Sequence, residues 1–76
     1  MKTSIYVTLK KGVLDPQGKA VQHALGSLGY KNVKGVRVGK FFEIELEGKS
    51  SEKEFKEMAE KLLANTVIED YRIEVK

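Results

Sequence analysis

The sequence predicts an α+β fold, a two-layer sandwich in which two helices cover one face of an antiparallel sheet in the order β-α-β-β-α-β. Three observations predict it. Apolar and polar residues alternate at both ends of the chain, as in strands with one buried face. Two intervening segments repeat apolar residues at helical spacing instead. The middle of the chain alternates again on both sides of Gly39 and Lys40.

Each predicted helix begins at a residue suited to capping it. Asp15 fits the N-cap of the first helix, and Pro16 fits its first position, where no amide hydrogen bond is lost. Ser51 and Glu54 form a capping box for the second helix, which is expected to end near Asn65. The apolar stripes comprise Ala20, Val21, Ala24, Leu25 and Leu28 in the first helix and Phe55, Met58, Ala59, Leu62 and Leu63 in the second.

Four strands are predicted from the alternation. Val36 and Val38 are expected to form the second of them. Gly39 and Lys40 then read as a hairpin turn, and Gly35 reads as a bulge. This element order is that of a ferredoxin-like fold. The apolar positions are Ile5, Val7 and Leu9; Val36 and Val38; Phe42, Ile44 and Leu46; and Tyr71, Ile73 and Val75.

Length and composition limit what the chain can be. Its 76 residues are expected to form one domain, 1–76, with a thin core, because so short a chain buries only about three-fifths of its unfolded surface. It has no cysteine and one histidine, which excludes disulfides and argues against a structural metal, so self-association is the expected source of extra stability. The lack of cysteine favours a reducing compartment, the cytoplasm, and neither a signal peptide nor a membrane span is expected.

Nucleic-acid binding is the first alternative, because the net charge is +3 and the element order matches RNA-recognition domains. Tyr6 would be placed to stack on a base. However, Glu43, Glu45 and Glu47 follow in the strand that would meet the phosphates, which is unfavourable for a polyanion. The basic residues are also scattered along the sequence, so they do not predict a continuous positive stripe.

The chain offers little material for catalysis. His23 faces outward on the predicted helix near Ser27, but no carboxylate lies there to orient its imidazole. Glu43, Glu45 and Glu47 are spaced about 6.6 Å apart along a strand, too far to share one small ion without other ligands. Their expected partners are cross-strand residues such as Arg37 and Arg72, or charges on another subunit. No catalytic, cofactor-binding or metal-binding residue is therefore expected on this chain.

Three long segments resemble the PurS family, the small subunit of phosphoribosylformylglycinamidine (FGAM) synthase. They are VLDPQGKAVQHALGSLGY, VRVGKFFEIELE and EKLLANTVIEDYRIEV, in the family's order and spacing. The resemblance implies a chain without an active site that joins a glutaminase subunit to a larger synthetase subunit and associates with itself as a dimer or higher oligomer. It also implies that the assembled complex uses ATP, magnesium and glutamine in purine synthesis.

Surface residues of the family segments are the expected partner contacts. Phe41 is expected to be exposed and unpaired beside Lys40 if Phe42 faces the core, and Val67 and Ile68 are further apolar candidates for exposure. A regulatory module of ferredoxin-like fold, binding a small ligand at a dimer interface, is the alternative function. The expected interface residues are Arg37, Lys40, Phe41, Asp70, Tyr71 and Arg72, followed by His23.

Overall fold

The structure is a computed structural model that describes residues 1–75. Within this range three antiparallel strands form one sheet in the order β2-β1-β3, which confirms the predicted α+β class and the antiparallel sheet. The elements are β1 (Lys2–Leu9), α1 (Pro16–Ser27), β2 (Gly39–Glu45), α2 (Glu52–Met58), the π-helical turn η1 (Ala59–Leu63) and β3 (Glu69–Val75).

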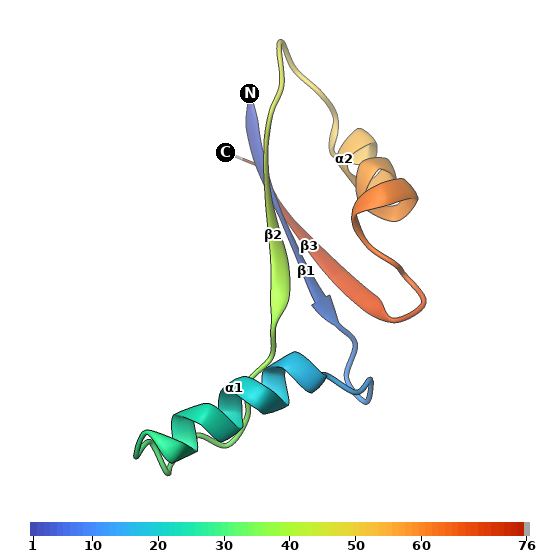
Figure 1. Cartoon of the computed structure of the whole chain (residues 1–76). Helices are drawn as coiled ribbons and strands as arrows, with labels where there is room; N and C mark the ends of the chain where they lie inside the picture. Colours follow the sequence, from blue (N-terminus) through green and yellow to red (C-terminus); the bar gives the residue numbers. More distant parts are fainter. Residues whose placement is uncertain (76) are drawn as a thin grey trace.

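The buried core lies between the central strand β1 and the helical segment α2–η1. Ile5 and Val7 of β1 are fully buried and pack with Ala59 and Ala64. Burial of an aliphatic side chain contributes about 1.5–3 kcal/mol, so this small cluster supplies much of the fold's stability. We call the sheet face that carries α2 the helix side. Figure 1 shows α2 on the β3 side of the sheet and β2 at the opposite edge, and Phe42 of β2 is half-buried against the core cluster.

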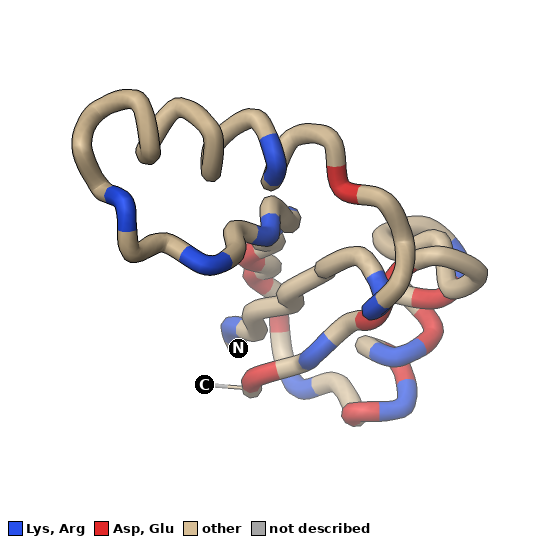
Figure 2. The backbone as a smooth tube through the Cα atoms, turned by 90° about the horizontal axis from the view of Figure 1, so that it is seen from below, with Lys and Arg blue, Asp and Glu red and all other residues tan. Residues whose placement is uncertain are grey.

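Helix α1 projects beyond the end of the sheet. Figure 1 shows it below the strands, whereas the sequence predicted that both helices would lie on one sheet face. The segment 30–38 returns alongside it, as Figure 2 shows from below. We call residues 10–38 the arm. The arm makes the molecule elongated, with principal extents of 48 × 24 × 14 Å.

A compact joint sets the direction of the arm. The Asp15 carboxylate caps α1 by accepting a hydrogen bond from the Gly18 amide at 2.9 Å, and it accepts a second from the Val38 amide at 3.0 Å. These two donors hold the pKa of Asp15 below its usual value. The Arg37 guanidinium also donates to the carbonyl of Leu9. The start of α1, the end of β1 and the approach to β2 are thereby tied together.

The predicted hairpin at Gly39 and Lys40 differs from the structure. Gly39 lies within β2 opposite Thr8, and a Cβ atom there would stand 2.4 Å from the carbonyl oxygen of Val7. Glycine is therefore required by the close approach of two strands and not by a turn. Val38 belongs to the joint instead of a fourth strand, and residues 33–38 carry no strand ladder in which Gly35 could form a bulge.

Gly18→Ala is expected to destabilise the protein, because the new Cβ would lie 2.3 Å from the Val36 carbonyl oxygen and 2.5 Å from Asp15 Oδ2. The expected loss of unfolding free energy is about 1–3 kcal/mol, measured by urea titration at fixed protein concentration. Gly26→Ala is the matched control in the same helix, where a Cβ meets nothing within 4 Å. It should stabilise by about 0.5–1 kcal/mol. Equal effects of the two changes would contradict the tight joint.

Asp15→Asn is expected to lower the urea midpoint at pH 7, because the amide side chain cannot accept both backbone hydrogen bonds with two oxygens. The folded-state pKa of Asp15 is depressed, so its stabilisation is present above the unfolded pKa near 4 and is lost as pH falls through the folded value. The gap between wild type and variant should therefore close below about pH 4. Asp70→Asn, which changes an exposed ion pair, should show a much smaller gap at pH 7.

Candidate functional site

An aromatic and arginine layer spans the sheet face opposite α2, which we call the open face. Tyr6 of β1 lies at its centre because the strand register places it opposite both Phe41 and Arg72. The rings of Tyr6 and Phe41 stack with their centroids 5.0 Å apart, and Arg72 Cζ lies 4.4 Å from the Tyr6 centroid. Phe41 is paired in this way and still 54% exposed. The layer therefore offers rigid aromatic surface and a cation at one place.

Carboxylates lie toward the other end of the open face. Lys2 Nζ lies 3.3 Å from Glu43 and 3.6 Å from Glu45, and its hydrogen bond to Glu43 raises the pKa of Lys2. These glutamates were expected to pair with cross-strand residues such as Arg37 and Arg72, or with charges on another subunit. Arg37 instead belongs to the joint, and Arg72 pairs with Glu74 at 3.2 Å. Exposed pairs of this kind contribute little to stability, so these charges remain available to a partner.

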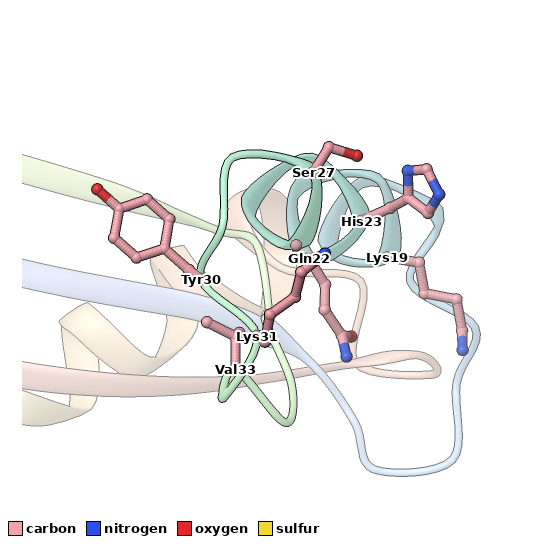
Figure 3. Close-up of a pocket in the computed structure, with 8 residues that line it drawn as sticks. Lys19, Gln22, His23, Ser27, Tyr30, Lys31 and Val33 are labelled. Carbon is pink, nitrogen blue, oxygen red and sulfur yellow. The ribbon is translucent and has the colours of Figure 1, made fainter.

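His23 lies on the arm, far along the chain from the open-face layer. Figure 3 shows it on α1 beside Lys19, bordering a groove of about 480 Å³ between α1 and the return segment. His23 is exposed, as predicted. Ser27 and Lys31 also line this groove together with Tyr30 and Val33, so its walls mix polar, basic and apolar side chains. Within the part of the chain that the structure describes, no hydrogen bond joins His23 to Ser27, and a nucleophile pair is not assembled.

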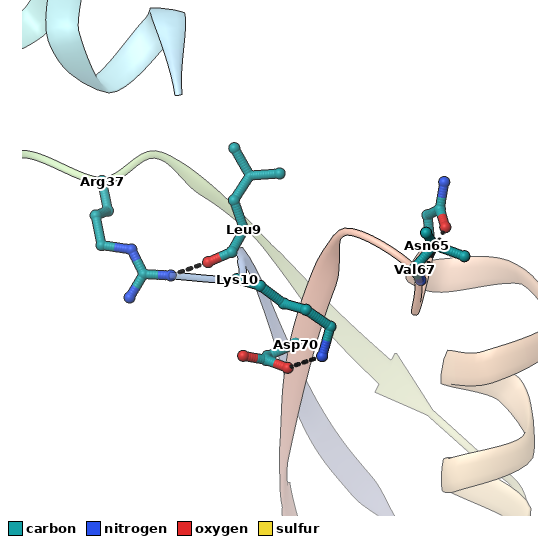
Figure 4. A network of polar contacts seen from close by, with 6 residues as sticks. All are labelled: Leu9, Lys10, Arg37, Asn65, Val67 and Asp70. Atoms are coloured by element: carbon teal, nitrogen blue, oxygen red, sulfur yellow. Dashed lines mark hydrogen bonds and ion pairs between the residues drawn. The ribbon is translucent and has the colours of Figure 1, made fainter. Parts of the chain in front are cut away.

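Asp70 lies at one end of the open face, opposite Thr8 of β1. Lys10 Nζ lies 2.6 Å from Asp70 Oδ1, and Figure 4 shows this pair close to the bond between Arg37 and Leu9. A hollow of about 330 Å³ lies between β1, β3 and the side chain of Arg72. Its lining comprises Tyr6, Thr8, Asp70, Tyr71 and Arg72.

The turn before β3 presents an apolar side chain to solvent. Asn65 Oδ1 accepts a hydrogen bond from the Val67 amide at 3.1 Å, and Figure 4 shows this turn beside the end of the helical segment. The Val67 side chain is largely exposed as a result, and Ile68 is partly so. The expectation that both could not be buried is confirmed.

Two of the predicted contact residues belong to the helix side. The Tyr71 hydroxyl donates a hydrogen bond to Glu60 at 2.9 Å, and this bond, with partial burial, raises the pKa of Tyr71. Lys40 Nζ lies 3.9 Å from Glu69. The predicted residues are therefore divided among surfaces: Phe41, Asp70 and Arg72 lie on the open face, Lys40 and Tyr71 on the helix side, and Arg37 and His23 on the arm.

A second uncovered surface is the apolar stripe of α1. Gly18 is buried against the return segment, and Leu25 of the predicted stripe is half-buried, but the other stripe residues face solvent. Val21 is 43% exposed and Leu28 is 75% exposed, and Ala24 between them is exposed as well. A row of apolar side chains along one helix face normally packs against another surface.

Sequence reasoning placed Tyr6 on the open face but missed its role as the centre of the layer. The sequence shows Tyr6 and Phe41 in two different strands, but only the pairing register of these strands shows that the two residues lie opposite each other.

Among residues 1–75, no three histidine or acidic side chains are placed to hold a metal ion. Over the same range, none of the helices is long and apolar enough to cross a membrane.

Comparison with known proteins agrees with the resemblance seen in the sequence. The family model PurS, phosphoribosylformylglycinamidine (FGAM) synthase, matches residues 2–76. The FGAM synthase subunit PurS of Bacillus subtilis is 58% identical over 76 residues, covering 97% of this chain and 90% of that protein. A crystal form of B. subtilis PurS superposes with a TM-score of 0.89 at 57% identity, covering 99% and 96% of the two chains.

A solved structure of PurLQS from Thermotoga maritima contains a chain that matches with a TM-score of 0.83 at 33% identity. The match covers 96% of this chain and 93% of that one. The sequence, the fold and the length thus agree along the whole molecule. This chain belongs to the PurS family of FGAM synthase subunits.

Proposed function

We propose that this chain acts as the non-catalytic small subunit of FGAM synthase and holds a glutaminase subunit against a larger synthetase subunit in the cytoplasm. The single observation that carries the proposal is that the chain's distinctive side chains form exposed contact surfaces. Tyr6, Phe41 and Arg72 are of the types that dominate binding energy at protein interfaces. The relative in the T. maritima PurLQS structure supports assembly with other subunits of the synthase.

The proposed benefit of this assembly is proximity. The larger subunits release ammonia from glutamine and use ATP with magnesium to convert formylglycinamide ribonucleotide to formylglycinamidine ribonucleotide, with glutamate, ADP and phosphate as the other products. Ammonia released into water is diluted and protonated before it can react. A subunit that holds the two sites in a fixed relation raises the effective concentration of ammonia at the second site.

The structure supports different roles for the predicted interface residues, some in contacts with partners and others in hydrogen bonds within the chain. Phe41, Asp70 and Arg72 share the open face, and we assign them to contact with a catalytic subunit. Arg37 and Tyr71 hold the arm and the helix side in place through hydrogen bonds to Leu9 and Glu60, which keeps both surfaces in register. The exposed Lys40 and His23 are assigned to contacts on the helix side and the arm.

Self-association belongs to the same proposal. The buried core is small, and the apolar stripe of α1 lies on a projecting arm where its own sheet does not cover it. Exposed apolar side chains in a row favour association with another surface by removing apolar area from water. We therefore propose that the chain is a dimer or a higher oligomer in solution.

The bridging function is tested by reconstituting the synthase from its three kinds of subunit. Leaving this chain out should abolish glutamine-dependent FGAM formation while ammonium chloride still supports synthesis by the large subunit. Phe41→Ala and Arg72→Ala should each weaken assembly by about tenfold. Lys53→Ala, on the exposed face of α2, is the control and should assemble normally. Glutamine-dependent turnover that is unchanged without this chain would contradict the proposal.

A further inference from the structure

We propose that the groove between α1 and the return segment, residues 30–38, binds a small organic phosphate monoester of nucleotide size. The phosphate lies between two lysine ammonium groups, and the organic group lies toward Tyr30 and Val33. This inference goes beyond the proposed bridging function and does not depend on it. Three features of the groove carry it: its cationic and hydrogen-bonding groups, a glycine that its own chain does not require, and its position away from the apolar stripe of α1.

The groove has the size of a small-molecule site. Its volume is about 480 Å³, which is within the range of ligand pockets in proteins. Three of its lining residues, Gln22, Gly26 and Val33, are half-buried and form its floor. The exposed lining residues form its rim, and Figure 3 shows Lys19 on one side of the view and Tyr30 on the other. A small molecule can therefore lie on the floor between these side chains.

The charged side chains that line the groove are cations. Lys19 belongs to α1 and Lys31 to the return segment, and Figure 3 shows the Lys31 side chain extending toward α1. Among residues 1–75, neither lysine forms a salt bridge. The arm contains one acidic residue, Asp15, whose carboxylate already accepts two backbone amides in the joint. An anion in the groove therefore meets two cations and no competing carboxylate from the arm.

Neutral hydrogen-bonding side chains stand beside these cations. Gln22, His23 and Ser27 line the groove from α1 at spacings that place them on one helix face. A phosphate monoester carries two negative charges and three acceptor oxygens, so it uses both lysines and several of these donors, whereas a single carboxylate uses fewer. Lys19 and Ser27 are eight residues apart, or about 12 Å along the helix axis. The row is longer than an inorganic phosphate and matches a phosphate that carries an organic group.

Gly26 in the floor is not explained by packing within the chain. Glycine is less favourable than alanine inside a helix. A Cβ atom at Gly26 would meet nothing within 4 Å, and Gly26 is not among the glycines with a positive φ. Neither a close neighbour nor the backbone conformation therefore requires glycine here. Glycine also allows a ligand to approach the backbone closely, which is the role that its place in the groove fits.

The groove lies on the opposite side of α1 from the apolar stripe. Its lining positions on α1 precede the stripe positions by two residues, as Lys19 precedes Val21 and Gly26 precedes Leu28. Two residues turn an α-helix by about 200°, so the two rows face nearly opposite directions. A surface that covers Val21 and Leu28 leaves this face of the helix open. Binding in the groove is therefore compatible with the proposed self-association.

The first experiment titrates the full, isotope-labelled chain with adenosine monophosphate and follows the backbone amides by NMR. Millimolar adenosine monophosphate should bind saturably and shift the amides of Gln22, Gly26 and Lys31. Adenosine lacks the phosphate and inorganic phosphate lacks the organic group, so each should bind at least about tenfold more weakly. Ribose phosphate should lie between them and the nucleotide, because it lacks the flat ring that packs on Tyr30.

The second experiment repeats the titration with two pairs of variants. Lys31→Met should weaken binding of adenosine monophosphate by about threefold to tenfold. Lys34→Met removes the same charge from the same segment but outside the groove, and should bind nearly as well as wild type. Gly26→Ala should weaken binding by about tenfold, because its methyl group occupies the floor. Gly35→Ala is its control, since a Cβ there also meets nothing within 4 Å and lies outside the groove.

The stability of the Gly26→Ala variant separates a binding role from a structural one. Its urea midpoint should rise, as expected for alanine inside a helix, while its affinity for adenosine monophosphate falls. A merely structural glycine would not give these opposite changes. Unchanged affinity in this variant would contradict the close approach of the ligand to the helix backbone.

Three further results would overturn the inference. The first is the absence of saturable shifts with millimolar adenosine monophosphate, and the second is equally tight binding of adenosine, which would show that the lysines are not used. The third is an equal loss of binding in Lys31→Met and Lys34→Met, which would indicate a general attraction of anions to the basic arm. All of these measurements use the isolated chain, so their outcome is independent of the reconstitution assay.

Discussion

The Asp15 carboxylate connects two backbone segments that are 23 residues apart, and the direction of the arm depends on it. One oxygen caps the start of α1 and the other accepts the amide of Val38 just before β2. Gly18 allows the two backbones to approach closely at this point, because any larger residue would meet the Val36 carbonyl. Because α1 is fixed at its first turn and extends away from the sheet, apolar side chains of this helix such as Val21 and Leu28 remain exposed.

This geometry explains how so small a chain can have two independent contact surfaces. A three-stranded sheet with one helical segment has an open face by construction, and strand register gathers Tyr6, Phe41 and Arg72 on it. The arm, which lies beyond the end of the sheet, adds exposed apolar side chains such as Val21 and Leu28 on α1. Contacts with another copy and contacts with a catalytic subunit can therefore occur together, which a bridging subunit requires.

The stability of the chain and its function are linked by the same exposed surfaces. The buried hydrophobic side chains are few, namely Ile5, Val7, Phe55, Ala59 and Ala64, so the free energy of unfolding of the isolated chain is expected to be small. Apolar area that would be a liability in a monomer becomes part of the core when a partner covers it. Contacts with partners therefore stabilise the folded chain in the same way as contacts in its interior, because binding to the folded state favours that state.

The local features of this protein were determined by its sequence alone. Asp15 and Pro16 begin α1, the capping box of Ser51 and Glu54 begins α2, and alternation marks β1 and β3, because each signal acts between residues close in the chain. The family was likewise evident from three contiguous segments, and the exposure of His23 followed from the helical period.

Only the tertiary structure decided where those elements lie. The sequence signals at Gly39 suggested a turn, but a neighbouring strand made it a site of close approach. Phe41 was expected to be unpaired, yet the register placed it on Tyr6, and the apolar stripe of α1 was expected in the core. Strand register and helix placement depend on contacts between residues far apart in the chain, such as Asp15 with Val38. Periodicity within a segment carries no information about them.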